Sequence, residues 1–208
     1  PTPAFERLVF LFTGEDATLS AAHAGQVDVA SVPPALAANV PAHMQRVIME
    51  SVDNRGILFP MQSANGEHAG SGAPIGNDVT ADIAVRRAIN LALDRDTLVE
   101  VALHGYGRPA FGPADGLPWS NSDERFAAPD LDQAEEILDA AGWQLRDDGL
   151  RYKDGLPASF RLTYPSSDTT RQLLAEVSAE MVRPLGIEIQ PTGRHWDEIQ
   201  REALHQDA

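Results

Sequence analysis

Residues 81–109 constrain the fold more than any other stretch, because their pattern predicts two helices in direct succession. In the first helix, apolar residues recur at a period of about 3.6, at Val85, Ala88, Ile89 and Ala92. A helix with one such face buries it against the rest of a domain. The stretch is therefore predicted to be scaffold in an α/β domain, and it carries no chemistry of its own.

Particular residues mark the ends of these two helices. Asp82 lies near the start of the first helix, where a negative charge complements the helix dipole. Asp94 can cap the second helix by accepting from exposed N–H groups, and Gly105 can end it in a left-handed conformation. The buried side of the second helix is predicted to hold Leu98, Val101 and Ala102.

The amino-acid sequence of this stretch resembles that of a known protein family. VRRAINLALDRDTLVEVALHGYGRPAFGP at 85–113 and DLDQAEEILDAAGW at 130–143 are similar to the solute-binding proteins of ABC importers in the peptide/nickel class. A separate passage, EDATLSAAHAGQVDVASVP at 15–33, resembles a segment of the first lobe in the same family. The resemblance implies an α/β fold with a mixed sheet, like one lobe of a type II periplasmic binding protein, with the two-lobed architecture only partly present.

The resemblance also implies a domain organisation and a location. Residues 1–60 are expected to be a remnant of the first lobe plus an interlobe crossover, and 61–208 most of the second, ligand-binding lobe, truncated at its C-terminus. The family implies a monomeric periplasmic or extracellular protein that is membrane-associated and has ABC permease subunits as partners. The first residues contain no signal peptide, so we expect the leader to lie outside this sequence.

The composition excludes several classes of protein. Of the 208 residues 43% are hydrophobic, which argues against disorder, and the formal net charge of −15 repels nucleic acid and anionic lipid. The chain has no cysteine, so disulfides, thiol chemistry and cysteine-rich zinc sites are excluded. The longest apolar runs, such as residues 8–12, are far shorter than the ~20 residues of a membrane helix.

The remaining stretches predict alternating elements and two long loops. Residues 8–12 and 27–30 are predicted strands on either side of a helix. Residues 46–61 are predicted to contain the crossover. The Gly- and Ser-rich residues 62–77 are predicted to be a loop, either ordered near a cleft or a flexible insertion, and residues 106–128 form a second long connection.

After the second loop, the sequence predicts a helix, a hairpin and a second β–α–β unit. Asp130 with Gln133 resembles a capping box, and residues 143–153 are predicted to form a hairpin that turns at 147–149. Residues 159–164 alternate apolar and polar side chains, as a half-covered strand does. A helix starting at 168 or 169, a strand at 187–189 and a last helix containing Trp196 complete the prediction.

No catalytic or metal motif is present in the sequence. The histidines are His23, His43, His68, His104, His195 and His205. None is spaced as in HExxH or H-x-x-H, so no metal site and no cofactor are predicted, although nickel uptake occurs in this family and imidazole suits nickel. The chain has no G-x-S-x-G elbow, no S-x-x-K motif and no phosphate loop, and an enzyme is not expected.

Candidate ligand-binding residues follow the predicted strands. In open α/β sheets, ligands bind at the carboxyl ends of strands, where loops and helix N-termini converge. The candidates at two such ends and just after the crossover are Tyr164, Ser166, Ser167, Arg171, Arg194, Trp196, Met61 and Ser63. Arg171 is suited to pair with a peptide carboxylate. Because the loss of a buried charge partner is costly, Arg171→Ala in the full-length protein is expected to weaken an acidic or free-carboxylate ligand by about thirtyfold or more. A solvated helix residue remains the alternative for Arg171, and core packing the alternative for Trp196.

The sequence supports one function and leaves alternatives open. A passive binder that closes two lobes around a peptide or similar small polar solute, and then docks on a permease, agrees with every feature above. A nickel-chelate or heme binder of the same family is the alternative within this class. A sensory or protein-interaction module that uses the same fold is the alternative outside it.

Overall fold

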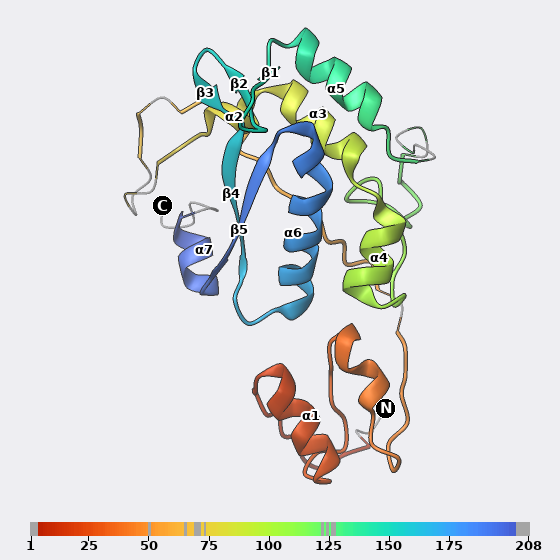
Figure 1. Cartoon of the computed structure of the whole chain (residues 1–208). Helices are drawn as coiled ribbons and strands as arrows, with labels where there is room; N and C mark the ends of the chain where they lie inside the picture. The colour runs from red at the N-terminus through yellow and green to blue at the C-terminus, as the bar shows by residue number, and fades with distance from the viewer. Residues whose placement is uncertain are drawn as a thin grey trace. The chain divides into compact units, whose positions relative to one another are not determined.

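The computed structural model describes residues 4–49, 51–64, 66–68, 72, 74–121, 123, 125 and 128–202. The chain divides into two compact units, Pro1–Ile48 (unit 1) and Met49–Ala208 (unit 2), and Figure 1 shows the elements of each. The assignment of residues 1–60 and 61–208 to different lobes of a larger protein stays a prediction, because compactness within this chain does not define those lobes. No helix among the described residues is long and apolar enough to cross a membrane.

The described part of unit 1 contains one α-helix and one short 3₁₀ helix. Helix α1 spans Glu15–His23 and η1 spans Pro34–Asn39. The strands predicted at 8–12 and 27–30 are wrong, because neither range forms a strand. A strand requires a neighbour for its backbone hydrogen bonds, and the described part of unit 1 supplies none.

The helical stretch at residues 78–103 agrees closely with its predicted pattern. Helix α2 (Asp78–Ala81) leads into α3 (Ile83–Ala92) and α4 (Arg95–Leu103). The side chains of Asp82 and Asp94 accept hydrogen bonds from backbone N–H groups at the starts of α3 and α4, as predicted. The buried residues of α3 include all four members of its predicted apolar face, Val85, Ala88, Ile89 and Ala92.

Helix α4 departs from its prediction in two details. Ala102 is buried, but Val101 is 44% exposed, because α4 buries only a narrow stripe. The left-handed ending starts one residue earlier than predicted, with φ of 49° at His104 and 76° at Gly105. The N–H of Gly105 then reaches back to the carbonyl of Val99 at 3.1 Å, which closes the helix end.

The hairpin follows α5 as predicted. Helix α5 (Leu131–Ala140) starts at Asp130, whose side chain accepts from the N–H of Gln133 at 2.9 Å. Strands β1 (Gln144–Leu145), β2 (Arg151–Lys153) and β3 (Leu156–Pro157) then form a small antiparallel sheet. Its first turn closes through the N–H of Gly149 and the carbonyl of Arg146.

A second sheet holds the parallel strands that position the candidate site. Strand β4 (Ser159–Pro165) pairs in parallel with β5 (Glu188–Arg194), from Ser159 opposite Glu188 to Pro165 opposite Arg194. Helix α6 (Thr169–Val182) and η3 (Arg183–Leu185) connect them, and α7 (Trp196–Glu202) follows β5. Figure 1 shows α6 alongside both strands with α4 next to it. With antiparallel and parallel pairings both present, the fold is the mixed α/β type predicted.

One apolar cluster joins the helices and the parallel strands of unit 2. It combines side chains from α3, α5, β4, η3 and β5, with the buried indole of Trp143 among them. Its largest fully buried members are Trp143, Ile89, Leu138, Leu185 and Ile187. This cluster fixes β4 and β5 against the helices, so the ends of the two strands have defined positions.

Candidate functional site

Six of the eight predicted site residues lie at or directly after the carboxyl ends of β4 and β5. Tyr164 is in β4 opposite Gly193 of β5. Ser166 and Ser167 form the turn into α6, Arg171 is in the first turn of α6, Arg194 ends β5, and Trp196 begins α7. The backbone N–H of Ser166 donates to the carbonyl of Arg194 at 2.9 Å, which ties the two strand ends together.

Two of these side chains have polar groups that no other described residue uses. Tyr164 and Arg194 are half-buried, and neither the Tyr164 hydroxyl nor the Arg194 guanidinium bonds to another described residue. Gly193 leaves room for the phenol, because a Cβ there would lie 3.3 Å from both the Tyr164 ring and its hydroxyl oxygen. A hydroxyl and a cation are therefore available for hydrogen bonds at this end of the strands.

Arg171 differs from Tyr164 and Arg194, because its side chain already has an ion-pair partner. Its guanidinium pairs with the carboxylate of Asp168, the residue that also caps α6 by accepting from the Arg171 N–H at 2.8 Å. The Arg171 side chain is 38% exposed. The prediction that loss of Arg171 weakens ligand binding about thirtyfold or more assumed a buried, unpaired arginine. Because a partly exposed ion pair contributes about 1 kcal/mol or less, we revise that magnitude downward.

A second ion pair lies close to Arg171 and was not anticipated from the sequence. Arg55 pairs with Asp53. The hydrogen bond from Arg55 lowers the pKa of Asp53, partial burial opposes this, and the positive charges of Arg55 and Arg171 add to the lowering. The sequence predicted only turn chemistry at Asp53. In the sequence, the only indication of this ion pair is that Asp53 and Arg55 are opposite charges two residues apart. Such spacing is common in surface loops.

The serines and Trp196 are accessible to solvent. Ser166 and Ser167 are exposed, and Trp196 is 46% exposed at the start of α7. Within the described chain, Trp196 therefore lies at the surface and not in the core. Trp196 therefore presents an exposed indole two residues after Arg194 in the sequence, and an indole offers a flat apolar face.

Met61 and Ser63 lie towards the opposite end of β4. The extended segment that precedes them places Asp53 near Arg171. Further along this segment, Phe59 packs edge-on against Phe160, with the two ring centroids 6.3 Å apart. Phe160 is near the amino end of β4. Met61 is 75% exposed, and Ser63 lies against Gly76 at the base of the 62–77 loop. The structure therefore does not bring these two residues together with the other six.

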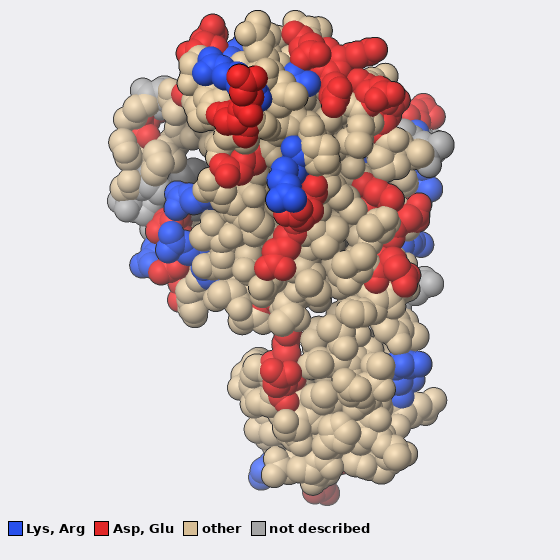
Figure 2. Space-filling model, in the orientation of Figure 1, with Lys and Arg blue, Asp and Glu red and all other residues tan. Residues whose placement is uncertain are grey.

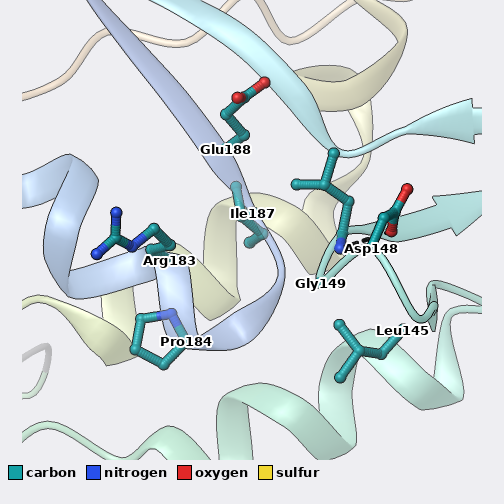
Figure 3. Close-up of a pocket in the computed structure, with 8 residues that line it drawn as sticks. Leu145, Asp148, Gly149, Arg183, Pro184, Ile187 and Glu188 are labelled. Atoms are coloured by element: carbon teal, nitrogen blue, oxygen red, sulfur yellow. Dashed lines mark hydrogen bonds between the residues drawn. The ribbon is translucent and has the colours of Figure 1, made fainter.

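A pocket of about 450 Å³ opens at the amino end of β5 (Figure 3). Its polar groups are already engaged. Asp148 accepts from the Leu150 N–H at 3.0 Å and the Tyr152 hydroxyl at 2.8 Å, and Glu188 accepts from Gln190 at 2.8 Å. Arg183 pairs with Glu180 at 2.9 Å. With its charges satisfied internally, this pocket is a weaker candidate than the strand ends.

The surface charge of unit 2 is uneven. Figure 2 shows acidic side chains gathered over α5, where Asp132, Glu135, Glu136 and Asp139 are exposed. Among the described residues, no group of three or more His, Asp or Glu side chains is arranged to hold a metal ion. His205 lies outside the described residues.

Comparisons with known proteins agree with this fold. Residues 1–207 match the family described as "Bacterial extracellular solute-binding proteins, family 5 Middle". Protein XP55 of Streptomyces lividans is 35% identical over 95% of this chain but only 34% of its own length. The chain thus spans about a third of this relative.

Two solved structures share the fold. The oligopeptide-binding protein AppA of Bacillus subtilis, in complex with a nonapeptide, is 30% identical with a TM-score of 0.55, over 60% of this chain and 26% of that one. NikZ of Campylobacter jejuni, in complex with Ni(L-His), has a TM-score of 0.72 at 24% identity, over 88% of this chain and 35% of that one. The match over 1–207, the XP55 similarity and the shared fold agree: the chain belongs to the family 5 extracellular solute-binding proteins, whose members serve ABC importers.

Proposed function

We propose that this chain is part of the substrate-binding component of an ABC importer, which captures a peptide or similar small polar solute between two lobes and delivers it to a membrane permease. The protein works as a monomer outside the cytoplasmic membrane. The carboxyl ends of β4 and β5 form part of the wall that contacts the solute. Binding favours the closed arrangement only to the extent that the solute contacts both lobes.

The observation that carries this proposal is the pair of free polar groups at those strand ends. The Tyr164 hydroxyl and the Arg194 guanidinium have no partner among the described residues, and both are half-buried. Partial burial strengthens a charged hydrogen bond relative to one in bulk water. A solute with a carboxylate and amide groups, such as a peptide, complements a cation, a hydroxyl and an exposed indole.

A peptide is preferred over a nickel complex because of the chemistry of the strand ends. The residues there are a cation, hydroxyls and an indole, and none is a strong ligand for nickel. A non-catalytic role belongs to the proposal, and it is supported by the description of the family as solute-binding proteins.

The test uses the full-length protein and thermal shift with short synthetic peptides, up to nonapeptide length. A ligand present at 100 times its dissociation constant stabilises the folded state by about 2.7 kcal/mol, so a cognate peptide raises the melting temperature. The nickel–histidine complex and heme serve as competing probes. If either of these raises the melting temperature and no peptide does, the peptide assignment is wrong.

The site itself is tested by Arg194→Ala, with Arg183→Ala as the matched control. Both arginines lie at the surface of unit 2, but Arg183 is at the far end of α6 and paired with Glu180. Calorimetry should show that Arg194→Ala weakens a free-carboxylate peptide by about tenfold or more, since a hydrogen bond to a charged group contributes about 1.5–3 kcal/mol. Equal affinities for the two variants would remove Arg194 from the site.

A further inference from the structure

Charged side chains from two distant segments gather where the candidate site lies. Arg55 and Asp53 form an ion pair in the segment that precedes the 62–77 loop, and Arg171 and Asp168 form another where α6 begins. The two pairs are neighbours, because the positive charge of Arg171 contributes to the lowered pKa of Asp53. Two arginines and two carboxylates thus alternate beside the carboxyl end of β4.

Hydrogen bonds hold this segment on unit 2. The side-chain amide of Asn54 donates to the carbonyl of Pro113 at 2.8 Å. Further along, the carbonyl of Pro60 accepts from the hydroxyl of Thr80 at 2.9 Å, and Thr80 is buried. The two members of the first ion pair lie on either side of Asn54 in the sequence. Their place near the start of α6 is therefore fixed by contacts within unit 2.

The ion pairs divide the arginines at this end of unit 2 into two kinds. Arg55 and Arg171 each have a carboxylate partner, whereas the guanidinium of Arg194 bonds to no other described residue. The negative charges of Asp53 and Asp168 offset two of the three positive charges. A solute at this end of the strands therefore meets one arginine of the three that has no carboxylate partner.

Asp53 is the carboxylate that controls how many arginines are available. Asp168 also caps α6 by accepting from the N–H of Arg171 at 2.8 Å, so its role is partly structural. Asp53 is 61% exposed and caps no helix. Its hydrogen bond from Arg55 lowers its pKa, so it is ionised at neutral pH. An ion pair this exposed contributes little to stability, so the fold survives its loss.

We propose that Asp53 determines specificity: by occupying Arg55 it limits the arginines available at this end of the strands, and so selects a solute with one carboxylate there over a solute with two. A second carboxylate finds no second free arginine among the three, and it meets the negative charges of Asp53 and Asp168. Repulsion of the wrong ligand is as effective a source of specificity as attraction of the right one. This role rests on the proposed function, because it requires a solute at the carboxyl ends of β4 and β5.

Calorimetry on the full-length protein tests this role with two nonapeptides, four Ser-Ala repeats followed by alanine or by glutamate. The first peptide has one carboxylate at its carboxyl end and the second has two. Asp53→Asn frees Arg55, and it is expected to raise the affinity for the glutamate peptide by about fivefold, the effect of one partly exposed charge pair. The affinity for the alanine peptide changes by less than about twofold. At about 1 M salt, where the Debye length is about 3 Å, the gain disappears.

Two further variants separate this role from a general change in charge. Glu180→Gln removes the same amount of negative charge and frees Arg183, but at the far end of α6. It is expected to leave the ratio of the two affinities unchanged. Asp53→Asn combined with Arg55→Gln removes the freed guanidinium, and it is expected to return the ratio to the wild-type value.

The outcomes distinguish this role from the proposed function. If the wild-type protein binds the peptides and Asp53→Asn leaves the ratio of affinities unchanged, the role of Asp53 is overturned and the proposed function stands. An equal gain in Glu180→Gln, or a gain that persists when Arg55 is also replaced, overturns the role in the same way. If neither peptide binds to the wild-type protein or to any variant, the proposed function and the role of Asp53 are both contradicted.

Discussion

Asp82 joins three parts of unit 2, and its removal is the sharpest test of how the unit is held together. Its carboxylate caps α3 through the N–H of Ala84 at 2.9 Å. It also accepts from the indole Nε1 of Trp143 at 3.0 Å and from the ammonium group of Lys153 at 2.8 Å. One side chain thus connects the start of α3 to Trp143, which follows α5, and to β2.

The cost of Asp82→Ala is the sum of three losses. Removing an N-cap costs about 1 kcal/mol. Trp143 is 1% exposed, so its N–H is left unsatisfied in the core at a cost of about 1–3 kcal/mol. Lys153 is 37% exposed, so solvent screens its share to less than about 1 kcal/mol. The expected total is about 3 kcal/mol, or roughly 6–12 °C in melting temperature for a domain of this size.

Asp94→Ala is the matched control, because the carboxylate of Asp94 caps α4 and has no tertiary partner among the described residues. Its carboxylate accepts from Asp96 and Thr97, both in the first turn of α4. The expected loss is about 1 kcal/mol, the value of a cap alone. The melting temperatures of both variants are measured by circular dichroism. If Asp82→Ala and Asp94→Ala lower the melting temperature equally, the bonds from Asp82 to Trp143 and Lys153 contribute nothing and the reasoning is refuted.

The pH dependence supplies a second readout for Asp82. Burial raises its pKa, but the hydrogen bonds from Lys153, Ala84 and Trp143 outweigh burial, so its folded-state pKa is lowered. A carboxyl with a depressed folded-state pKa contributes stability above its unfolded-state pKa of about 3.9, which is lost as pH falls through the folded-state value. The stability difference between the wild-type chain and Asp82→Ala should therefore be complete at neutral pH and shrink under acidic conditions. A difference that grows on acidification contradicts the assignment.

Three further predictions concern separate sites. Arg151→Met should lower the free energy of unfolding in urea by about 2–4 kcal/mol, because two buried carbonyl oxygens lose their guanidinium donor; a loss below about 0.5 kcal/mol would contradict it. Gly76→Ala should cost about 1–3 kcal/mol in thermal melts, since φ is +86° and the new Cβ would lie 2.3 Å from the Ser63 carbonyl oxygen; an unchanged melting temperature would show that the loop is placed differently. Arg171→Ala in the full-length protein should weaken a free-carboxylate peptide by only about two- to fivefold in calorimetry, with Arg183→Ala unchanged, and a loss of thirtyfold or more would show that Asp168 releases Arg171 when the solute binds.

Local patterns in the sequence were sufficient for the helices and turns of unit 2. The caps at Asp82, Asp94 and Asp130, and the turn at Gly149, depend on groups a few residues apart. Such hydrogen bonds form whatever the rest of the chain does, so a single sequence is enough to anticipate them. The apolar face of α3 was likewise predictable, because a period of 3.6 residues is visible without any knowledge of the partner surface.

The candidate site shows where this kind of inference stops. The sequence indicated the strand ends that hold Tyr164 and Arg194, since strand alternation and the following helix are local features. It could not indicate that Arg171 is neutralised by Asp168, or that the 51–60 segment carries Asp53 and Arg55 towards the same place. Ion pairing of this kind depends on rotamers and on distances between segments, which no periodicity encodes.

The family resemblance, the caps and the buried face of α3 were determined by the sequence alone, because they are properties of order and spacing. Tertiary structure alone decided which apolar segments are covered. Leu8–Phe12 has the composition of a buried strand, yet it forms no strand here, while the equally apolar face of α3 is fully buried. The physical reason is that a helix satisfies its own backbone hydrogen bonds, whereas a strand exists only when another strand lies beside it.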